Sequence, residues 1–171
     1  MGIAIRVERT EDRAAIRAVH EAAFDRSDEA SLVDALRSRG GVLLSLLAVE
    51  DGRVVGHVLY SPVSVGSDAR RIEGAGLGPV AVLPQCQRRG IGAMLIDEGN
   101  RRIERINCPF VVVLGDPAYY TRFGFEPARQ HGMTCVWDVP HDAFMVSVLQ
   151  PVLMERICGV ATYRPEFSDV A

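Results

Sequence analysis

The stretch Val80-Ala81-Val82-Leu83-Pro84-Gln85-Cys86-Gln87-Arg88-Arg89-Gly90-Ile91-Gly92-Ala93 decides the fold, because its character changes at the proline. The residues before the proline form an apolar run that is typical of a buried strand. The residues after it lead into apolar positions at helical spacing, which predicts a helix from about Arg89 to Arg105. The first N–H groups of a helix have no partner inside it and carry partial positive charge. Glycines let a phosphate approach these groups and arginines add charge, so the stretch predicts a phosphate cradle.

Two nucleotide motifs with similar glycines do not fit this cradle. A P-loop needs Gly-Lys-Ser or Gly-Lys-Thr at the start of the helix, and neither tripeptide occurs here. A dinucleotide fingerprint needs a third glycine where Leu95 stands, and it opens a βαβ unit near the start of a domain. The phosphate therefore belongs to another kind of ligand.

The remaining pattern predicts a mixed sheet with helices packed on it, which is an α+β fold. Asp51-Gly52 between two apolar runs indicates a hairpin. Thr10 is expected to cap a first helix, and Leu32 to Leu36 lie in a second. Further strands are expected at Ile3 to Val7, Val42 to Val49, Val54 to Val65, Leu77 to Leu83, Phe110 to Leu114, Thr134 to Val139, Phe144 to Leu149 and Gly159 to Tyr163.

Composition places limits on the function. The chain has 171 residues, of which 48% are hydrophobic and 24% charged, as expected for one compact domain. Its formal net charge of −3 argues against a general nucleic-acid binder. The four cysteines and four histidines show no metal-ligand spacing, so no metal is expected. No signal peptide or membrane span is visible, and we expect a soluble cytoplasmic protein without a membrane partner.

A second motif, Leu114-Gly115-Asp116-Pro117-Ala118-Tyr119-Tyr120-Thr121-Arg122-Phe123-Gly124-Phe125, follows the Phe110 to Leu114 strand. Together the two motifs resemble the GNAT N-acetyltransferases, whose coenzyme A motif is Arg/Gln-x-x-Gly-x-Gly/Ala and whose later signature is Tyr-x-x-x-Gly-Phe. The resemblance covers about residues 3 to 127. Residues 128–171 resemble a bacterial branch with the Leu-Gly-Asp-Pro-x-Tyr-Tyr motif and extra C-terminal strands.

The resemblance implies one acetyltransferase domain over residues 1–171, with a GNAT core at 1–127 and a β-rich extension at 128–171. The sheet would be mostly antiparallel, with helices on both faces and splayed central strands. The activity would be acetyl transfer from acetyl-CoA to a primary amine of a small molecule, protein or peptide by direct attack. The alternative is a regulatory coenzyme A-binding module with little catalysis. A homodimer is also compatible with the family.

Roles follow from the motif positions. The backbone of Val80, Ala81 and Val82 would pair with the pantetheine arm, and a bulge at Gly76 or Gly78 would open the strand edge. The cofactor's phosphates would be bound by Gln87, Arg88, Arg89, Gly90, Ile91, Gly92 and Ala93. Tyr120 would border the cofactor and donate a proton to the leaving thiolate, with Tyr119 and ordinary aromatic packing as the alternatives.

The general base stays open. Many family members carry a glutamate on the strand before the coenzyme A motif, where this chain has Gly74 to Gly78. The nearest upstream acid is Glu73, which is a direct base, a base acting through water, or a surface charge. His57 alternates with apolar residues and is interpreted as a solvent-facing or satisfied strand histidine. Asp116 precedes a proline and is interpreted as a helix cap or a turn residue.

Overall fold

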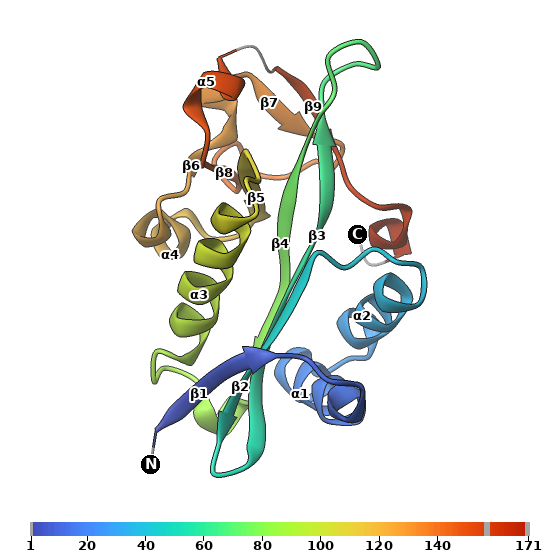
Figure 1. Cartoon of the computed structure of the whole chain (residues 1–171), viewed down its shortest axis with the longest axis vertical. Helices are drawn as coiled ribbons and strands as arrows, with labels where there is room; N and C mark the ends of the chain where they lie inside the picture. Colours follow the sequence, from blue (N-terminus) through green and yellow to red (C-terminus); the bar gives the residue numbers. More distant parts are fainter. Residues whose placement is uncertain (1, 156–157, 170–171) are drawn as a thin grey trace. The chain divides into compact units, whose positions relative to one another are not determined.

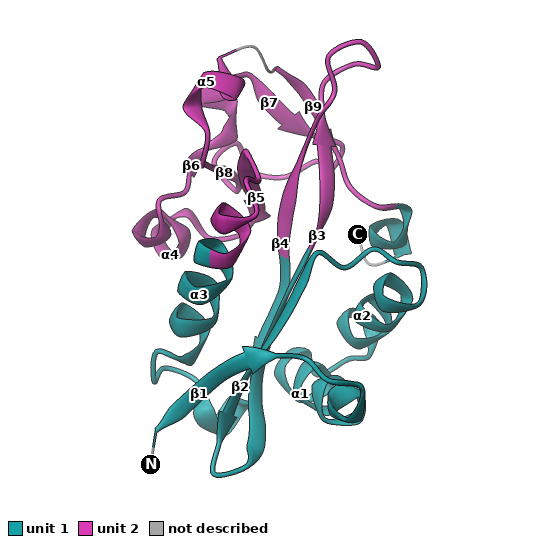
Figure 2. Ribbon diagram, viewed as in Figure 1, with its two compact units in different colours: residues 1–60, 78–101, 165–171 teal, residues 61–77, 102–164 magenta. Residues whose placement is uncertain are grey.

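The structure, a computed structural model, describes residues 2–155 and 158–169 (Figure 1). Contacts between Cα atoms divide the chain into two compact units (Figure 2). Unit 1 comprises residues 1–60, 78–101 and 165–171, and unit 2 comprises residues 61–77 and 102–164. The predicted single domain, with its core at 1–127 and extension at 128–171, stays a prediction.

The elements follow the expected order. The strands are β1 (Ile3–Val7), β2 (Leu44–Glu50), β3 (Arg53–Val65), β4 (Ile72–Val82), β5 (Phe110–Leu114), β6 (Glu126–Pro127), β7 (Met133–Cys135), β8 (Phe144–Val148) and β9 (Gly159–Thr162). The α-helices are α1 (Arg13–Phe24), α2 (Asp28–Ser38), α3 (Ile91–Arg105), α4 (Pro117–Tyr120) and α5 (Pro151–Met154). Short 3-10 turns are η1 (Thr10–Asp12), η2 (Pro84–Cys86), η3 (Thr121–Phe123), η4 (Ala128–His131) and η5 (Pro165–Asp169).

Unit 1 is built on an antiparallel sheet. β1 pairs with β2, and β2 pairs with β3 across the turn Asp51-Gly52. Both turn residues have positive φ, 49° and 77°, as a two-residue hairpin turn with the twist of its strands requires. The hairpin predicted from the Asp-Gly pair is therefore confirmed.

Helices cover both faces of this sheet. On one face α1 and α2 enclose a core whose buried members are Ile16, Leu32, Val33, Leu36, Leu47 and Leu59. On the other face α3 packs closely on β3. A Cβ at Gly56 would lie 3.1 Å from Leu95, and a Cβ at Gly99 would lie 2.4 Å from the Tyr60 ring. Gly99 therefore makes room for an aromatic ring where the sequence alone shows only a weak point in a helix.

Unit 2 combines parallel and antiparallel pairing. β5 pairs antiparallel with β8, β8 with β6, and β9 runs parallel to β7. β4 runs parallel to β5, but only Ala75 and Gly76 pair, with Val111 and Val112. The buried core of this unit includes Val63, Val65, Phe110, Val112, Met133, Phe144 and Val146.

The structure confirms the predicted fold class and corrects several boundaries. α3 begins at Ile91 rather than Arg89, because Arg88 and Gly90 have φ of 61° and 83°, outside the helical region. Thr10 does not cap the first helix. It begins the turn η1, and the Asp12 carboxylate accepts a hydrogen bond from the N–H of Arg9 at 2.7 Å. β7 ends at Cys135 and does not continue to Val139.

Candidate active site

The loop before α3 has the backbone geometry of a phosphate cradle. The helix's first internal bond runs from the N–H of Met94 to the carbonyl of Gly90, at 3.0 Å. The N–H groups of Ile91, Gly92 and Ala93 therefore precede the helix's hydrogen-bond ladder. A Cβ built on Gly90 would meet no atom within 4 Å, so the space beside this glycine is open. These groups suit an anion, and the residues present fit a coenzyme A pyrophosphate.

Three side chains of this loop, those of Gln87, Arg88 and Arg89, differ in their hydrogen-bond partners. The Arg89 guanidinium binds Glu50, at the end of β2, through Nη1 at 3.1 Å and Nη2 at 2.5 Å. Gln87 donates from Nε2 to the carbonyl of Val82 at 3.0 Å, which ties the loop to the end of β4. Arg88 is exposed and makes no hydrogen bond or ion pair with any described residue. Arg88 is thus the arginine whose charge is available to a ligand, whereas Arg89 must first leave Glu50.

The strand that precedes the cradle has an edge without a strand partner. The N–H of Leu83 donates to the carbonyl of Val55 at 2.9 Å, so this end of β4 lies against β3. Among the described strands, β5 pairs with β4 only at Ala75 and Gly76, and none pairs with that edge at Val80 to Val82. Gly78 has φ of 136°, which is accessible to glycine, and β4 continues through it from Ile72 to Val82, so the bulge expected at Gly76 or Gly78 stays a prediction.

The glycines earlier in β4 have a packing role. A Cβ at Gly74 would lie 2.4 Å from the Phe110 ring. A Cβ at Gly76 would lie 2.7 Å from Val63 and 3.0 Å from Tyr163. These positions exclude any larger side chain, and this explains why the strand carries no carboxylate there. Glu73, the acid that precedes them, is exposed.

Tyr120 ends the short helix α4 and is 8% exposed. Its ring contacts Tyr119 and Phe125 edge-on, with centroids 5.0 and 5.8 Å apart. Gly115 makes room for it, because a Cβ there would lie 2.2 Å from the ring. Burial, with a smaller contribution from Tyr119, raises the pKa of Tyr120 to about 12, so its hydroxyl stays protonated. Asp116 caps α4 as predicted, accepting from the N–H of Ala118 at 3.0 Å.

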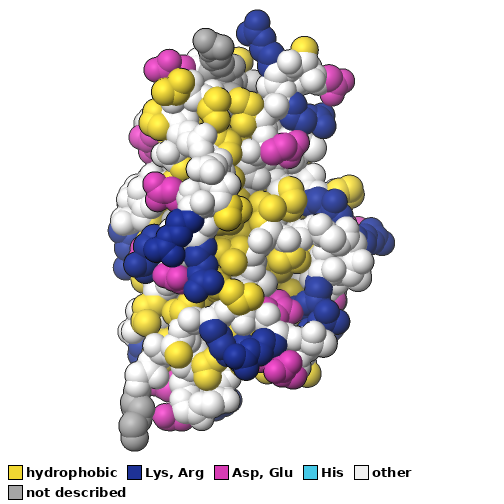
Figure 3. Space-filling model, viewed as in Figure 1, with side chains coloured by type: hydrophobic (Ala, Val, Ile, Leu, Met, Phe, Trp, Pro, Cys, Tyr) yellow, Lys and Arg dark blue, Asp and Glu magenta, His cyan; other side chains and the backbone are white. Residues whose placement is uncertain are grey.

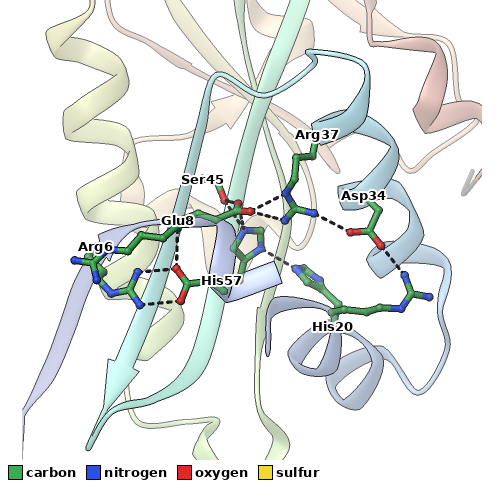
Figure 4. A network of polar contacts seen from close by, with 10 residues as sticks. Arg6, Glu8, His20, Asp34, Arg37, Ser45 and His57 are labelled. Carbon is green, nitrogen blue, oxygen red and sulfur yellow. Dashed lines mark hydrogen bonds and ion pairs between the residues drawn. The ribbon is translucent and has the colours of Figure 1, made fainter. Parts of the chain in front are cut away.

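One cluster was not predicted as a unit. His57 is fully buried and contacts Ser45 and His20, which come from β2 and α1 (Figure 4). The interpretation of His57 as a satisfied strand histidine is confirmed, and its solvent-facing alternative is wrong. The partner His20 stands 37 positions away, a separation over which sequence periodicity carries no information.

Comparison with known proteins fits this geometry. The model of the acetyltransferase (GNAT) domain matches residues 4–128. The chain therefore belongs to the GNAT acetyltransferase family, and it is an acyl-CoA N-acyltransferase. It is 37% identical over 166 residues to YhbS of Escherichia coli, an uncharacterized N-acetyltransferase, covering 96% of this chain and 98% of that protein.

Two solved structures are similar over nearly the whole chain. YhbS of Escherichia coli in complex with CoA aligns with a TM-score of 0.90 at 36% identity, covering 97% of this chain and 92% of that one. A GNAT family acetyltransferase of Brucella melitensis in complex with acetyl-CoA aligns with a TM-score of 0.79 at 37% identity. That alignment covers 97% of this chain and 98% of the other. The resemblance read from the two motifs is thus confirmed at the level of the family.

Within residues 2–155 and 158–169, no group of three or more His, Cys, Asp or Glu side chains could hold a metal ion. No helix in the described part of the chain is long and apolar enough to cross a membrane. On the face seen in Figure 3, basic side chains lie in separate groups with acidic side chains among them.

Proposed function

We propose that this chain transfers the acetyl group of acetyl-CoA to a primary amine of a small molecule, protein or peptide, by direct attack of the amine. The observation that carries the proposal is the cradle at Gly90. It combines open space, the first N–H groups of α3 and the unpaired Arg88 guanidinium. The complexes of similar proteins with CoA and acetyl-CoA support this ligand. The cofactor supplies an activated acetyl thioester, and the chain's residues bind it, orient it and move protons.

The proposed roles follow from the positions of the groups. The N–H groups of Ile91 to Ala93, with Arg88, neutralise the phosphate charge. The free edge of Val80 to Val82 offers backbone groups to the pantetheine amides in the manner of an added strand. An N–H group in this stretch stabilises the oxyanion that develops on the thioester carbonyl. Tyr120 donates a proton to the thiolate, and its raised pKa keeps that proton available at neutral pH.

The alternative, a coenzyme A-binding module with little catalysis, is favoured by one observation. Glu73, the candidate base, is exposed, and Gly74 and Gly76 exclude a carboxylate from the strand beyond it. An assay of thiol release over a panel of amines separates the two proposals. The chain has no lysine, so acetylation of its own side-chain amines adds no background. Amine-dependent release supports the enzyme, and binding of coenzyme A without release supports the module.

A matched pair of glycine substitutions tests the cradle. Gly90 and Gly52 have φ of 83° and 77°, and neither would have an atom within 4 Å of an added Cβ. Gly90→Ala and Gly52→Ala therefore impose the same backbone strain, about 1–2 kcal/mol each. Only Gly90→Ala is expected to weaken coenzyme A binding, measured by calorimetry. Equal affinities in the two variants would refute the cradle, and no thermal stabilisation of the wild type by CoA or acetyl-CoA would refute both proposals.

A further inference from the structure

A pocket of about 430 Å³ opens at one end of the unit 1 sheet. Its walls come from the end of β1, the turn η1, the first residue of α1, the end of α2 and the start of β2. This volume lies within the range of about 300–1,000 Å³ that small-molecule sites occupy. None of the residues that line it belongs to the coenzyme A cradle or to the free edge of β4.

The pocket and the cradle lie at opposite ends of β2. Leu44 and Ser45 begin this strand and line the pocket. Glu50 ends the strand and binds Arg89 of the cradle loop. The strand has seven residues, and a rise of about 3.3 Å per residue places its two ends about 20 Å apart. A ligand in the pocket is therefore not held by the first N–H groups of α3.

One part of the pocket's lining is apolar and accessible. Val7 is 47% exposed and Leu43 is 41% exposed, and both line the pocket. The half-buried Val42 and Leu44 line it as well. A single exposed apolar side chain is ordinary on a protein surface, but four that line one pocket form a wall for the apolar part of a ligand.

The more deeply placed charges of the pocket neutralise each other. The Arg37 side chain, which is 13% exposed, donates from Nε to the Glu8 carboxylate at 2.7 Å. It also donates from Nη1 to Asp34 at 2.8 Å. The Ser45 hydroxyl gives the Glu8 carboxylate a further hydrogen bond, and Figure 4 shows these groups together beside the end of β1. Glu8 is thus held by the protein itself and presents no free negative charge.

Two other arginines add positive charge to the lining. Arg9 and Arg13 are both exposed and both line the pocket. Arg13 makes no hydrogen bond or ion pair with any described residue. Arg9 interacts with Asp12, but that carboxylate is already bound by Arg6 at 2.7 and 2.9 Å. Among the described residues that line the pocket, three are arginines and one is a carboxylate, so the lining is positively charged.

This combination of groups selects one chemical class of ligand. A guanidinium binds a carboxylate through two parallel hydrogen bonds. The positive lining opposes an ammonium ion, and an inorganic anion would leave the apolar wall uncovered. We propose that the pocket binds a small organic carboxylate with an apolar body. The carboxylate pairs with Arg13 and Arg9, and the apolar body covers Val7 and Leu43.

Benzoate, which joins a carboxylate to an apolar ring, is the probe for this site. NMR titration of protein labelled at leucine and valine methyl groups is expected to show saturable shifts at Val7 and Leu43, with a Kd in the millimolar range. Benzamide keeps the ring without the charge, and acetate keeps the charge without the ring. Each should bind about tenfold more weakly, since a hydrogen-bonded charge or a buried ring contributes at least this factor.

The same titrations can overturn the proposal. It is wrong if Val7 and Leu43 show no saturable shift with millimolar benzoate. It is also wrong if benzamide or acetate binds as tightly as benzoate, because the charge or the apolar wall then has no role. Displacement of benzoate by CoA would place the probe at the cofactor site, with the same consequence.

Paired substitutions test the two parts of the site. Arg13→Gln should weaken benzoate binding about tenfold, because it removes the unpaired guanidinium. Arg53→Gln, which changes an exposed arginine at the start of β3 outside the pocket, should keep the Kd of the wild type. Leu43→Ser should also weaken benzoate, whereas Ile106→Ser, at a position 60% exposed and outside the pocket, should not. Equal affinities within either pair would overturn the assignment of that part.

Thermal unfolding gives a second readout. Sodium benzoate should raise the Tm of the wild type more than sodium chloride at the same ionic strength, and this difference should shrink in Arg13→Gln. If Arg13→Gln does not fold, the comparison of benzoate with benzamide on the wild type still decides the question. None of these measurements needs acetyl-CoA or an amine, so a failure of the proposed acetyl transfer would leave this inference standing.

Discussion

Arg89 and Glu50 form a two-point ion pair, with Nη1 3.1 Å and Nη2 2.5 Å from the two carboxylate oxygens. The pair joins the cradle loop to the end of β2, at the hairpin with β3. The hydrogen bond from Arg89 lowers the pKa of Glu50, so this carboxylate is ionised at neutral pH. An anionic ligand therefore competes with Glu50 for the Arg89 guanidinium.

Removing the charge of Glu50 should tighten coenzyme A binding. Glu50→Gln frees Arg89 for the ligand, and an exposed ion pair of this kind corresponds to about a two- to fivefold change in Kd. Calorimetric titration with CoA measures this. Asp51→Asn, which removes a charge next to Glu50 in the hairpin turn, is the control and should leave Kd unchanged. A weaker Kd in Glu50→Gln would mean that the ion pair holds the loop in its binding form.

Gly99→Ala should destabilise the protein although alanine is the better helix former. The gain in helix propensity is about 1 kcal/mol. The added Cβ would lie 2.4 Å from the Tyr60 ring, and overpacking of this kind costs about 1–3 kcal/mol. Urea unfolding of Gly99→Ala, Tyr60→Leu and the double variant forms a cycle. If the Tyr60 ring is the cause, Gly99→Ala should lower the free energy of unfolding when Tyr60 is present. In the Tyr60→Leu background the same substitution should raise it.

Tyr120→Phe should lower kcat by about 10²- to 10⁴-fold and leave the affinity for CoA unchanged. Because burial raises the pKa of Tyr120 to about 12, the wild-type rate should not fall through loss of this proton below about pH 11. Tyr119→Phe is the matched control on the neighbouring residue. A large loss of kcat in Tyr119→Phe with none in Tyr120→Phe would mean that Tyr119, not Tyr120, donates the proton.

At low pH the protein should lose the part of its free energy of unfolding that the ionised Asp12 carboxylate contributes. Arg6 binds both Asp12 oxygens, at 2.7 and 2.9 Å, and this hydrogen bonding lowers the pKa of Asp12 to about 2. The folded pKa lies below the unfolded value near ~3.9, so the contribution is complete above about pH 4 and lost as pH falls through about 2. Asp12→Asn should cost about 1–3 kcal/mol at neutral pH and flatten the acid limb of the stability curve.

Urea unfolding at a series of pH values measures this dependence. Glu11→Gln, a neutralised carboxylate at the adjacent exposed position, is the control and should keep the acid limb of the wild type. An unchanged acid limb in Asp12→Asn would assign the loss of stability to other carboxylates.

Local signals were sufficient for much of the fold. The Asp51-Gly52 turn, the Asp116 cap and the apolar strand at Phe110 to Leu114 depend on neighbouring residues, and each was predicted from sequence. The glycines and arginines of the cradle also stand together in the chain. Their pattern identified the family, although Arg88 and Gly90 delay the start of α3.

Contacts between distant residues were not accessible in this way. Arg89 meets Glu50 across 39 positions, and His20 meets His57 across 37. Such pairs depend on strand register and helix packing, which no short window of sequence contains. For the same reason the close approach of Gly99 to the Tyr60 ring could not be predicted, since Tyr60 is far away in the chain.

Gly74 and Gly76 of β4 also restrict which substitutions this protein can accumulate during evolution. A carboxylate at position 74 or 76 would collide with Phe110, Val63 or Tyr163, and shrinking one of those neighbours first would leave a cavity. Each order of the two substitutions therefore passes through a destabilised intermediate. A lineage that has acquired both the glycines and the large neighbours has little access to a strand glutamate by single steps.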